Sequence, residues 1–278
     1  MRTAIFKNKP LRFVIYTYLL FGFLLLTLGG IAKVWLHGTP LVMRWLMAIT
    51  AWTSALVLLL MFPKLFPNTT LRQFCKRLFN EKLNYRLLFF TISIQIVIYV
   101  LSISLVARQN QISALSLLDF SFSTLATGIF FTAIQGSTGE EPGWRGYLLP
   151  EVSRKIGVVK GSLMVSLIWA FWHAPIWFLD SGYVGADLIQ YILEFVICIT
   201  SLGFIIGISY YHCKNLLIPI ALHFTFNFLG VTFEGAWLDL VFWYAVFYFI
   251  VAMGFFIWHQ TKPFFREEED RDGKFIHS

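Results

Sequence analysis

Four groups of polar side chains in this chain lie within or beside long apolar stretches, where ionisable groups are costly. The groups are Glu140-Glu141-Pro142-Gly143-Trp144-Arg145, His173 after Trp169-Ala170-Phe171-Trp172, His223 with Asn227, and Glu194. A charge at the centre of a membrane helix costs about 2.5–3.5 kcal/mol even on the lenient insertion scale. Such residues normally face one another or a cavity. The sequence therefore predicts a polar site buried in an apolar body.

The composition indicates what kind of body this is. The 278 residues are 58% hydrophobic and 18% aromatic, and only 13% are charged. A soluble domain carries about 25% charged residues. The three cysteines are an odd and widely spaced set, which excludes a disulfide framework and a zinc finger. These numbers exclude soluble, fibrous and disordered classes and predict an all-α, polytopic membrane helix bundle.

Eight apolar segments approach the length of about 20 residues that a bilayer crossing needs. They are 13–32, 40–62, 87–107, 119–136, 161–179, 187–210, 215–233 and 237–258. If both termini are cytoplasmic, eighteen of the 22 basic residues lie in cytoplasmic segments, as the positive-inside rule favours. The net charge of +7 therefore reflects topology and not nucleic-acid binding. We expect one integral domain over 1–262, with the core of its polar motifs at about 120–230, and a charged cytoplasmic tail over 263–278. The compact length favours a prokaryotic cell membrane.

The basic loop at 63–86 has two interpretations. Arg72, Lys76 and Arg77 alternate with apolar residues such as Phe74 and Leu78, which is typical of a short helix lying on anionic headgroups. A solvated loop that only sets topology explains the same residues.

The depth of the polar residues suggests that they meet. Counted from the nearest inner basic residue at 1.5 Å per helical residue, Glu140 lies about 21 Å deep, His173 about 20 Å and His223 about 14 Å. Three separate spans thus bring ionisable groups to a similar level. We expect a shared pocket in the cytoplasmic half of the membrane.

Spacing within each span supports a shared pocket. Glu141 and Arg145 are four residues apart on one helical face, with the acid on the N-terminal side, which favours an ion pair. His223 and Asn227 have the same spacing and project from one face.

Small residues around the glutamates predict a helix break. An unbroken helix from Asp119 to Ser153 would be about 52 Å long, far more than a bilayer needs. We expect a break near Gly136–Gly139, with Ser137 or Thr138 capping a helix that begins around Pro142.

These groups suit hydrolysis by activated water. Neighbouring carboxylates do not both ionise cheaply in a low dielectric. Arg145 would hold Glu141 as an anion, which leaves Glu140 to accept a proton from water with help from His173. No serine or cysteine is placed as a nucleophile.

Two versions of this chemistry remain open. His223 and Asn227 would donate hydrogen bonds to the oxyanion of a hydrolysed amide. In the other version Glu140, His173 and His223 form a two-histidine, one-glutamate zinc site with one position open for water.

The order of the motifs resembles the CPBP intramembrane proteases, which include the CAAX prenyl endopeptidases. The motifs are Glu-Glu-x-x-x-Arg from Glu140, His173 four residues after an aromatic residue, and His-x-x-x-Asn from His223. The family often has phenylalanine where this chain has Trp169, a departure expected to keep an aromatic wall. The resemblance implies that Glu140 and His173 activate water, with His223 and Asn227 stabilising the oxyanion. Glu141 with Arg145 would order the motif.

The family is commonly labelled metalloprotease. For this chain the favoured interpretation is a mechanism without a cofactor, with Zn²⁺ as the alternative.

The predicted function is an intramembrane endopeptidase. Its partners would be membrane lipids and a membrane-associated peptide or protein substrate, lipid-modified or not, and no nucleic acid. One alternative is a non-catalytic membrane scaffold or immunity protein of the same fold, in which the polar groups are an ion-pair brace, a packed histidine and interhelical hydrogen bonds. Another is a proton-coupled transporter with Glu140, Glu141 and Glu194 as a relay, although no internal repeat is present.

Two further features have structural interpretations. Glu194 fits no motif and is expected to tie a helix or to support a site residue. The aromatic residues Trp169, Phe171, Trp172 and Trp177 line a lipid-facing slot in one interpretation and pack at an interface in the other.

Overall fold

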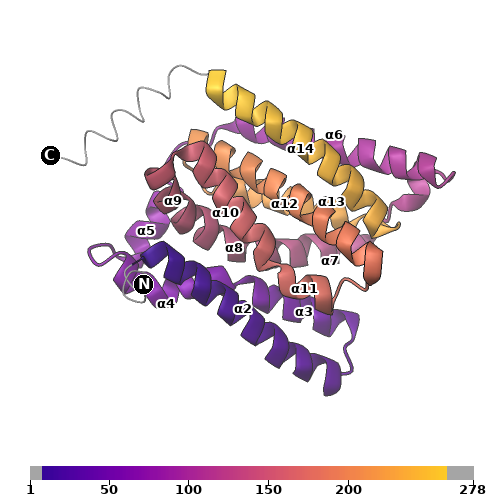
Figure 1. Cartoon of the computed structure of the whole chain (residues 1–278), viewed down its shortest axis with the longest axis horizontal. Helices are drawn as coiled ribbons and strands as arrows, with labels where there is room; N and C mark the ends of the chain where they lie inside the picture. The colour runs from indigo at the N-terminus through magenta and orange to yellow at the C-terminus, as the bar shows by residue number, and fades with distance from the viewer. Residues whose placement is uncertain (1–7, 262–278) are drawn as a thin grey trace.

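The computed structural model describes residues 8–261, and the tail predicted over 263–278 lies outside this range. Within it the regular structure is helical, apart from one isolated antiparallel bridge between Leu118 and Phe233. The helices form a bundle, with α10, α12 and α13 in its middle (Figure 1). A polytopic helical membrane protein is confirmed.

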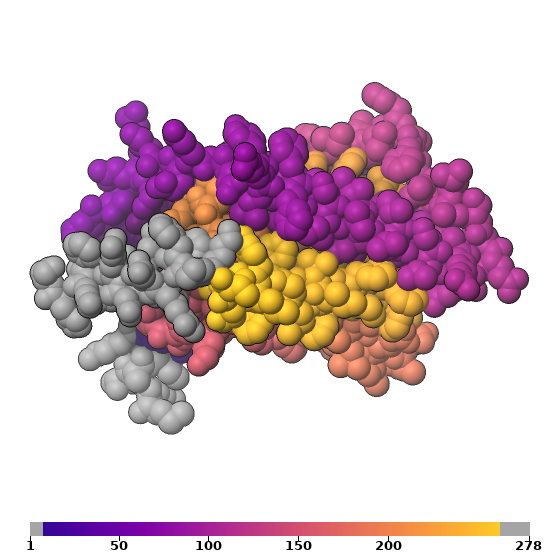
Figure 2. Space-filling view, turned by 90° about the horizontal axis from the view of Figure 1, so that it is seen from above, coloured from indigo at the N-terminus to yellow at the C-terminus, as the bar shows by residue number. Residues whose placement is uncertain are grey.

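Six stretches are long and apolar enough to cross a membrane. They are α2 (Lys9–Val34), α3 with α4 (Pro40–Ala51 and Thr53–Leu65), α6 (Tyr85–Gln109), α10 with α11 (Val158–Trp172 and Ala174–Leu179), α12 (Gly185–Cys213) and α14 (Trp237–Thr261). Figure 2 shows α6 and α14 side by side on one face. Both helices carry exposed apolar side chains, such as Phe89 and Phe249, as contact with lipid requires.

The count of eight spans is not confirmed. The segments predicted at 119–136 and 215–233 are shorter helices, α7 (Phe122–Thr132, 11 residues) and α13 (Leu217–Val231, 15 residues). At 1.5 Å per residue they are about 16 and 22 Å long, too short to cross some 30 Å of hydrocarbon unaided. Both pack against other helices of the bundle.

The glutamate motif lies on an irregular helical path between Phe122 and Ile156. After α7 come a π-helical turn (Ala133–Ser137), α8 (Thr138–Gly143), a second π-helical turn (Trp144–Leu148) and α9 (Leu149–Ile156). The break expected near Gly136–Gly139 is present as a kink at Gln135, whose φ and ψ of −82° and −105° are not helical. Broken backbone of this kind is tolerated at membrane depth beside a cavity or within protein.

The capping expected next to this break is wrong. The helix that carries the glutamates begins at Thr138, and Pro142 lies inside it. Neither Ser137 nor Thr138 caps the helix. Their hydroxyls donate instead to carbonyls five residues earlier, at 3.2 and 2.6 Å. The π-helical turn runs directly into α8, so the backbone at Ser137 and Thr138 is already helical. Their hydroxyls therefore bond to carbonyl oxygens of the preceding turn and not to N–H groups of the following one.

The basic loop contains the short helix α5 (Leu71–Leu78), which Thr70 and Gln73 begin with a capping box. Its apolar residues Phe74 and Leu78 are buried, and Phe74 packs against Phe62 at the end of α4. A helix is therefore confirmed, and its apolar side covers protein. Contact of its basic side with headgroups stays a prediction.

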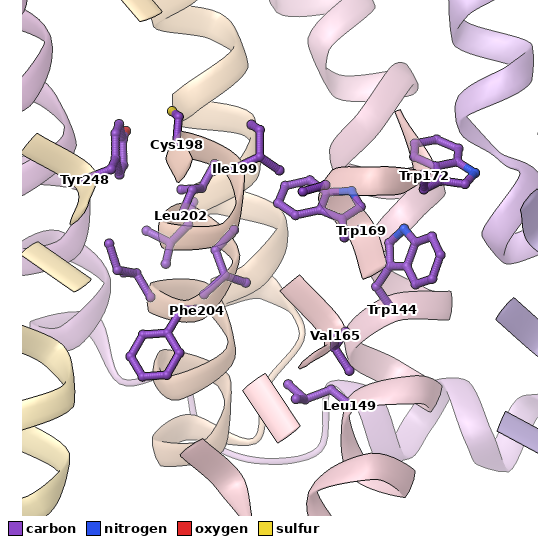
Figure 3. Packing of buried hydrophobic residues seen from close by; sticks show 14 of the residues in the cluster. Trp144, Leu149, Val165, Trp169, Trp172, Cys198, Ile199, Leu202, Phe204 and Tyr248 are labelled. Atoms are coloured by element: carbon purple, nitrogen blue, oxygen red, sulfur yellow. The ribbon is translucent and has the colours of Figure 1, made fainter. Parts of the chain in front are cut away.

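The core beside the motif is aromatic. Trp144, Trp169 and Trp172 are fully buried. Figure 3 shows Trp169 next to Ile199 of α12, and Trp172 farther from α12, beside Trp144. Large buried rings tolerate few alternative packings. This packing fixes α10 relative to the π-helical turn that carries Trp144.

Candidate functional site

A cavity of about 370 Å³ lies inside the bundle, within the size range of small-molecule and peptide pockets. Glu140 from α8, His173 from the end of α10, and His223 with Asn227 from α13 line it. These four residues, which lie far apart in the sequence, are thus brought together at one cavity. The remaining lining is largely apolar, including Phe21, Met47, Trp172, Phe195, Phe226 and Trp237.

Glu140 is buried, with 3% of its surface exposed, and one of its oxygens is held. The indole Nε1–H of Trp169 donates to Glu140 Oε2 at 2.5 Å. Oε1 accepts no hydrogen bond from any residue between 8 and 261. An oxygen at a cavity wall without a protein donor is placed to accept a hydrogen bond from water.

The backbone of the motif is held by α4. Ser54 donates to the carbonyl oxygens of Glu140 (2.9 Å) and Gly139 (3.3 Å), and the indole of Trp52 donates to the Ile134 carbonyl at 2.6 Å. A Cβ on Gly139 would lie 2.8 Å from the Trp52 ring, so only glycine allows this approach. These supports were not predicted. The signal that could have found them is Trp52-Thr53-Ser54, a less apolar interruption of the second span.

Glu141, Arg145 and His223 form a buried charged group. Arg145 Nη1 lies 3.1 Å and His223 Nδ1 2.8 Å from the same oxygen, Glu141 Oε1. The side chains of Arg145 and Glu141 are 1% and 0% exposed. The ion pair predicted from spacing is confirmed. The bond to His223, from a residue 82 positions along the chain, was not predicted.

The Glu141 bond determines what His223 offers to the cavity. A carboxylate only accepts hydrogen bonds, so His223 Nδ1 carries a proton. Nε2 is then an acceptor in the neutral ring and a donor in the charged ring. The oxyanion role expected of His223 therefore requires the imidazolium form.

His173 has a similarly defined tautomer. Its Nδ1 lies 2.8 Å from the carbonyl oxygen of Trp169, which only accepts, so Nδ1 carries the proton and Nε2 of the neutral ring is an acceptor. His173 lies at the junction of α10 and α11, and Pro175 occupies the first turn of α11. The helix break there places a half-buried imidazole at the cavity wall.

His223 and Asn227 project into the cavity from one face of α13, as their spacing predicts. The kinked backbone passes directly against them. A Cβ on Gly136 would lie 2.8 Å from His223 Nε2 and 3.0 Å from Asn227 Nδ2. Glycine at this position therefore leaves room for the two polar side chains.

The other singled-out residues have different surroundings. Glu194 lies outside the cavity lining and accepts a hydrogen bond at 2.8 Å from Gln190, four residues earlier in the same helix. A role for Glu194 in joining helices or supporting a site residue stays a prediction. Trp169 and Trp172 line the cavity, and Phe171 is exposed. Trp177 is buried in a separate small apolar cluster.

The arrangement does not fit the zinc site considered above. In the described part of the chain, no group of three or more His, Cys, Asp or Glu side chains is placed to hold a metal ion.

Comparison with known proteins agrees with the motifs. Residues 121–229 match the family model described as type II CAAX prenyl endopeptidase Rce1-like. Over 112 residues the chain is 31% identical to a protein named CAAX prenyl protease 2 from Methanococcus maripaludis. That match covers 39% of this chain and 41% of the relative, so less than half of either protein is aligned. All six predicted site residues lie within the matched segment.

Proposed function

Because residues 121–229 match the family model described as type II CAAX prenyl endopeptidase Rce1-like, we propose that this protein is an intramembrane endopeptidase that hydrolyses a peptide bond with water. The observation that carries the proposal is the cavity in which Glu140, His173, His223 and Asn227 converge from three helices. It combines acceptors for water with donors for an oxyanion, the two requirements of amide hydrolysis.

In this mechanism two acceptors orient the water. Glu140 Oε1 and His173 Nε2 accept its hydrogens, and its oxygen bonds to the substrate carbonyl carbon as one proton passes to Glu140. The carbonyl oxygen becomes an oxyanion, to which Asn227 and the charged form of His223 donate. The C–N bond then breaks, and Glu140 returns the proton to the leaving nitrogen. One carboxylic acid and one amine are formed from amide and water.

The lining favours a membrane-associated substrate. Apart from the polar groups at the proposed scissile bond, the cavity wall is mostly aromatic and aliphatic. Such a wall binds apolar side chains or a lipid modification near the cleaved bond. We propose as substrate a membrane-associated peptide or protein segment, lipid-modified or not.

Hydrolysis in liposomes tests the proposal. The purified protein is reconstituted and incubated with membrane-partitioning peptides in ¹⁸O-labelled water, and products are identified by mass spectrometry. We expect a new C-terminus that carries label from water, and unchanged activity after treatment with a chelator. Loss of activity on chelation, restored by Zn²⁺, would support the metal version instead.

The same liposomes test the alternatives. Absence of cleavage, together with flux that depends on pH and membrane potential, would favour a transporter. Absence of both activities would favour a scaffold or immunity role.

We further propose that both termini face the cytoplasm and that the cavity lies in the cytoplasmic half of the membrane. The start of α2, α5, α9 and the end of α14 lie at the same end of the bundle (Figure 1). The basic residues Arg72, Lys76, Arg154 and Lys155 lie on α5 and α9. The positive-inside rule assigns this end to the cytoplasm.

A thiol on α5 checks the orientation. Cys75 is exposed, whereas Cys198 and Cys213 are buried. A membrane-impermeant maleimide should label Cys75 in inverted vesicles and leave it unlabelled in intact cells. Cys75→Ser is the control that identifies the labelled site. Labelling from outside intact cells would show the opposite topology.

A further inference from the structure

Trp169 contacts four of the six predicted site residues, namely Glu140, Arg145, His173 and His223. Its Nε1–H donates to Glu140 Oε2 at 2.5 Å, and the Arg145 guanidinium lies 4.4 Å from its ring centroid. The ring of His223 meets it edge-on with centroids 5.0 Å apart. Its own carbonyl accepts the Nδ1–H of His173 at 2.8 Å. One residue thus contacts groups from the π-helical turn, α8, α10 and α13.

We propose that Trp169 is a positioning residue that determines which oxygen of Glu140 receives the proton from water. The indole N–H holds Oε2, which directs Oε1 to the reacting water. This inference rests on the proposed function, because it assigns a cause to the orientation of its general base. It changes the expectation for Trp169, where an aromatic wall alone was predicted.

The N–H group is the part of Trp169 that matters for this role. A carboxylate has two equivalent oxygens and rotates about its terminal bond, since that torsion is broad. A hydrogen bond to a charged oxygen is roughly twice as strong as one between neutral groups. Held at 2.5 Å by a ring that is 0% exposed, Glu140 keeps one orientation before substrate arrives. Preorganisation of this kind lowers the cost of reaching the transition state.

Neighbouring tryptophans show that packing alone does not explain this bond. Trp144 and Trp172 belong to the same buried cluster, with Trp144 6.0 Å from Trp172 between ring centroids. The indole nitrogens of both have no hydrogen-bond partner among residues 8–261. The core therefore holds buried tryptophans without pairing their N–H groups, whereas Trp169 directs its N–H to Glu140.

The same residue also orients His173. Because that contact uses the backbone carbonyl, it survives any side-chain substitution at Trp169. Replacement by phenylalanine keeps a ring beside Arg145 and removes the N–H donor to Glu140. Trp169→Phe therefore isolates the hydrogen bond from the other contacts.

Kinetics of Trp169→Phe test the inference. We expect kcat to fall about 10- to 100-fold, the range for losing a hydrogen bond to a charged group, with KM changed less than about threefold. Trp177→Phe is the matched control, because Trp177 is also buried but belongs to a separate cluster. Its kcat and KM should stay within about twofold of the unsubstituted protein. A Trp169→Phe enzyme with unchanged kcat would overturn the inference.

Two additional arms separate this inference from the proposed function. If Glu140→Gln remains as active as the unsubstituted protein, the proposed function fails whatever Trp169 does. If Glu140→Gln is inactive and Trp169→Phe is fully active, only the role of Trp169 fails.

A spectroscopic arm requires no substrate. The ultraviolet resonance Raman spectrum of the unsubstituted protein minus that of Trp169→Phe isolates the Trp169 indole. We expect a strongly hydrogen-bonded N–H, and loss of that signature when the same difference is taken in a Glu140→Ala background. A signature that is unchanged by Glu140→Ala would overturn the inference, even if Trp169→Phe folds poorly in the activity assay.

Discussion

We expect Glu140→Gln to abolish peptide-bond hydrolysis while the helical bundle remains folded. Glutamine has nearly the same shape, and its amide oxygen still accepts the Trp169 N–H. It does not take a proton from water at the Oε1 position, so the general base is lost. Removal of a general base lowers kcat by about 10²- to 10⁴-fold. The measurement is the initial rate on the membrane-partitioning peptide, with folding checked by thermal unfolding in detergent.

The matched control for this prediction is Glu151→Gln. Glu151 lies on α9 in an exposed ion pair with Arg154 at 3.0 Å and does not line the cavity. Its removal should leave kcat within about twofold, because exposed pairs contribute little. A Glu140→Gln enzyme as active as Glu151→Gln would show that Glu140 is not the base, and the hydrolytic mechanism proposed above would be withdrawn.

Arg145→Met is expected to cause the largest loss of stability. It removes the guanidinium 3.1 Å from Glu141 and leaves a carboxylate that is 0% exposed paired only with His223. Breaking a buried ion pair by removing one partner costs about 3–5 kcal/mol, because an uncompensated charge stays in the interior. The free energy of unfolding, measured by denaturant titration in a fixed detergent, should fall by this amount.

Two variants make this prediction specific. Arg154→Met removes an exposed arginine from a pair of the same chemistry and should change the free energy of unfolding by about 1 kcal/mol or less. Glu141→Gln combined with Arg145→Met removes both charges and should recover part of the loss. If Arg145→Met is as mild as Arg154→Met, Glu141 and Arg145 are not a buried pair in the folded protein.

Together the two predictions distinguish the general base, Glu140, from the structural ion pair of Glu141 with Arg145. Glu140→Gln should remove activity at little cost in stability, whereas Arg145→Met should lower stability first. The sequence left both roles open for this motif, because Glu140, Glu141 and Arg145 are equally costly in an apolar segment. The structure separates them by their partners, since Glu140 lines the cavity and Glu141 and Arg145 bond to each other.

Local features were predictable from the chain alone. Low charge content implies a membrane bundle, because too little polar surface is present to cover a soluble one. The ion pair of Glu141 with Arg145 and the common face of His223 and Asn227 follow from 3.6 residues per helical turn. Both depend on one helix at a time, which is why spacing sufficed.

Contacts between helices were decided only in the folded bundle. The bonds from Trp169 to Glu140, from His223 to Glu141 and from Ser54 to the Glu140 carbonyl join residues 29, 82 and 86 positions apart. Membrane helices are apolar on most sides, so their periodicity does not determine how each is rotated against its neighbours. The short α7 and α13 have the same origin, because packing around a buried polar cavity, and not hydropathy, determined where these helices end.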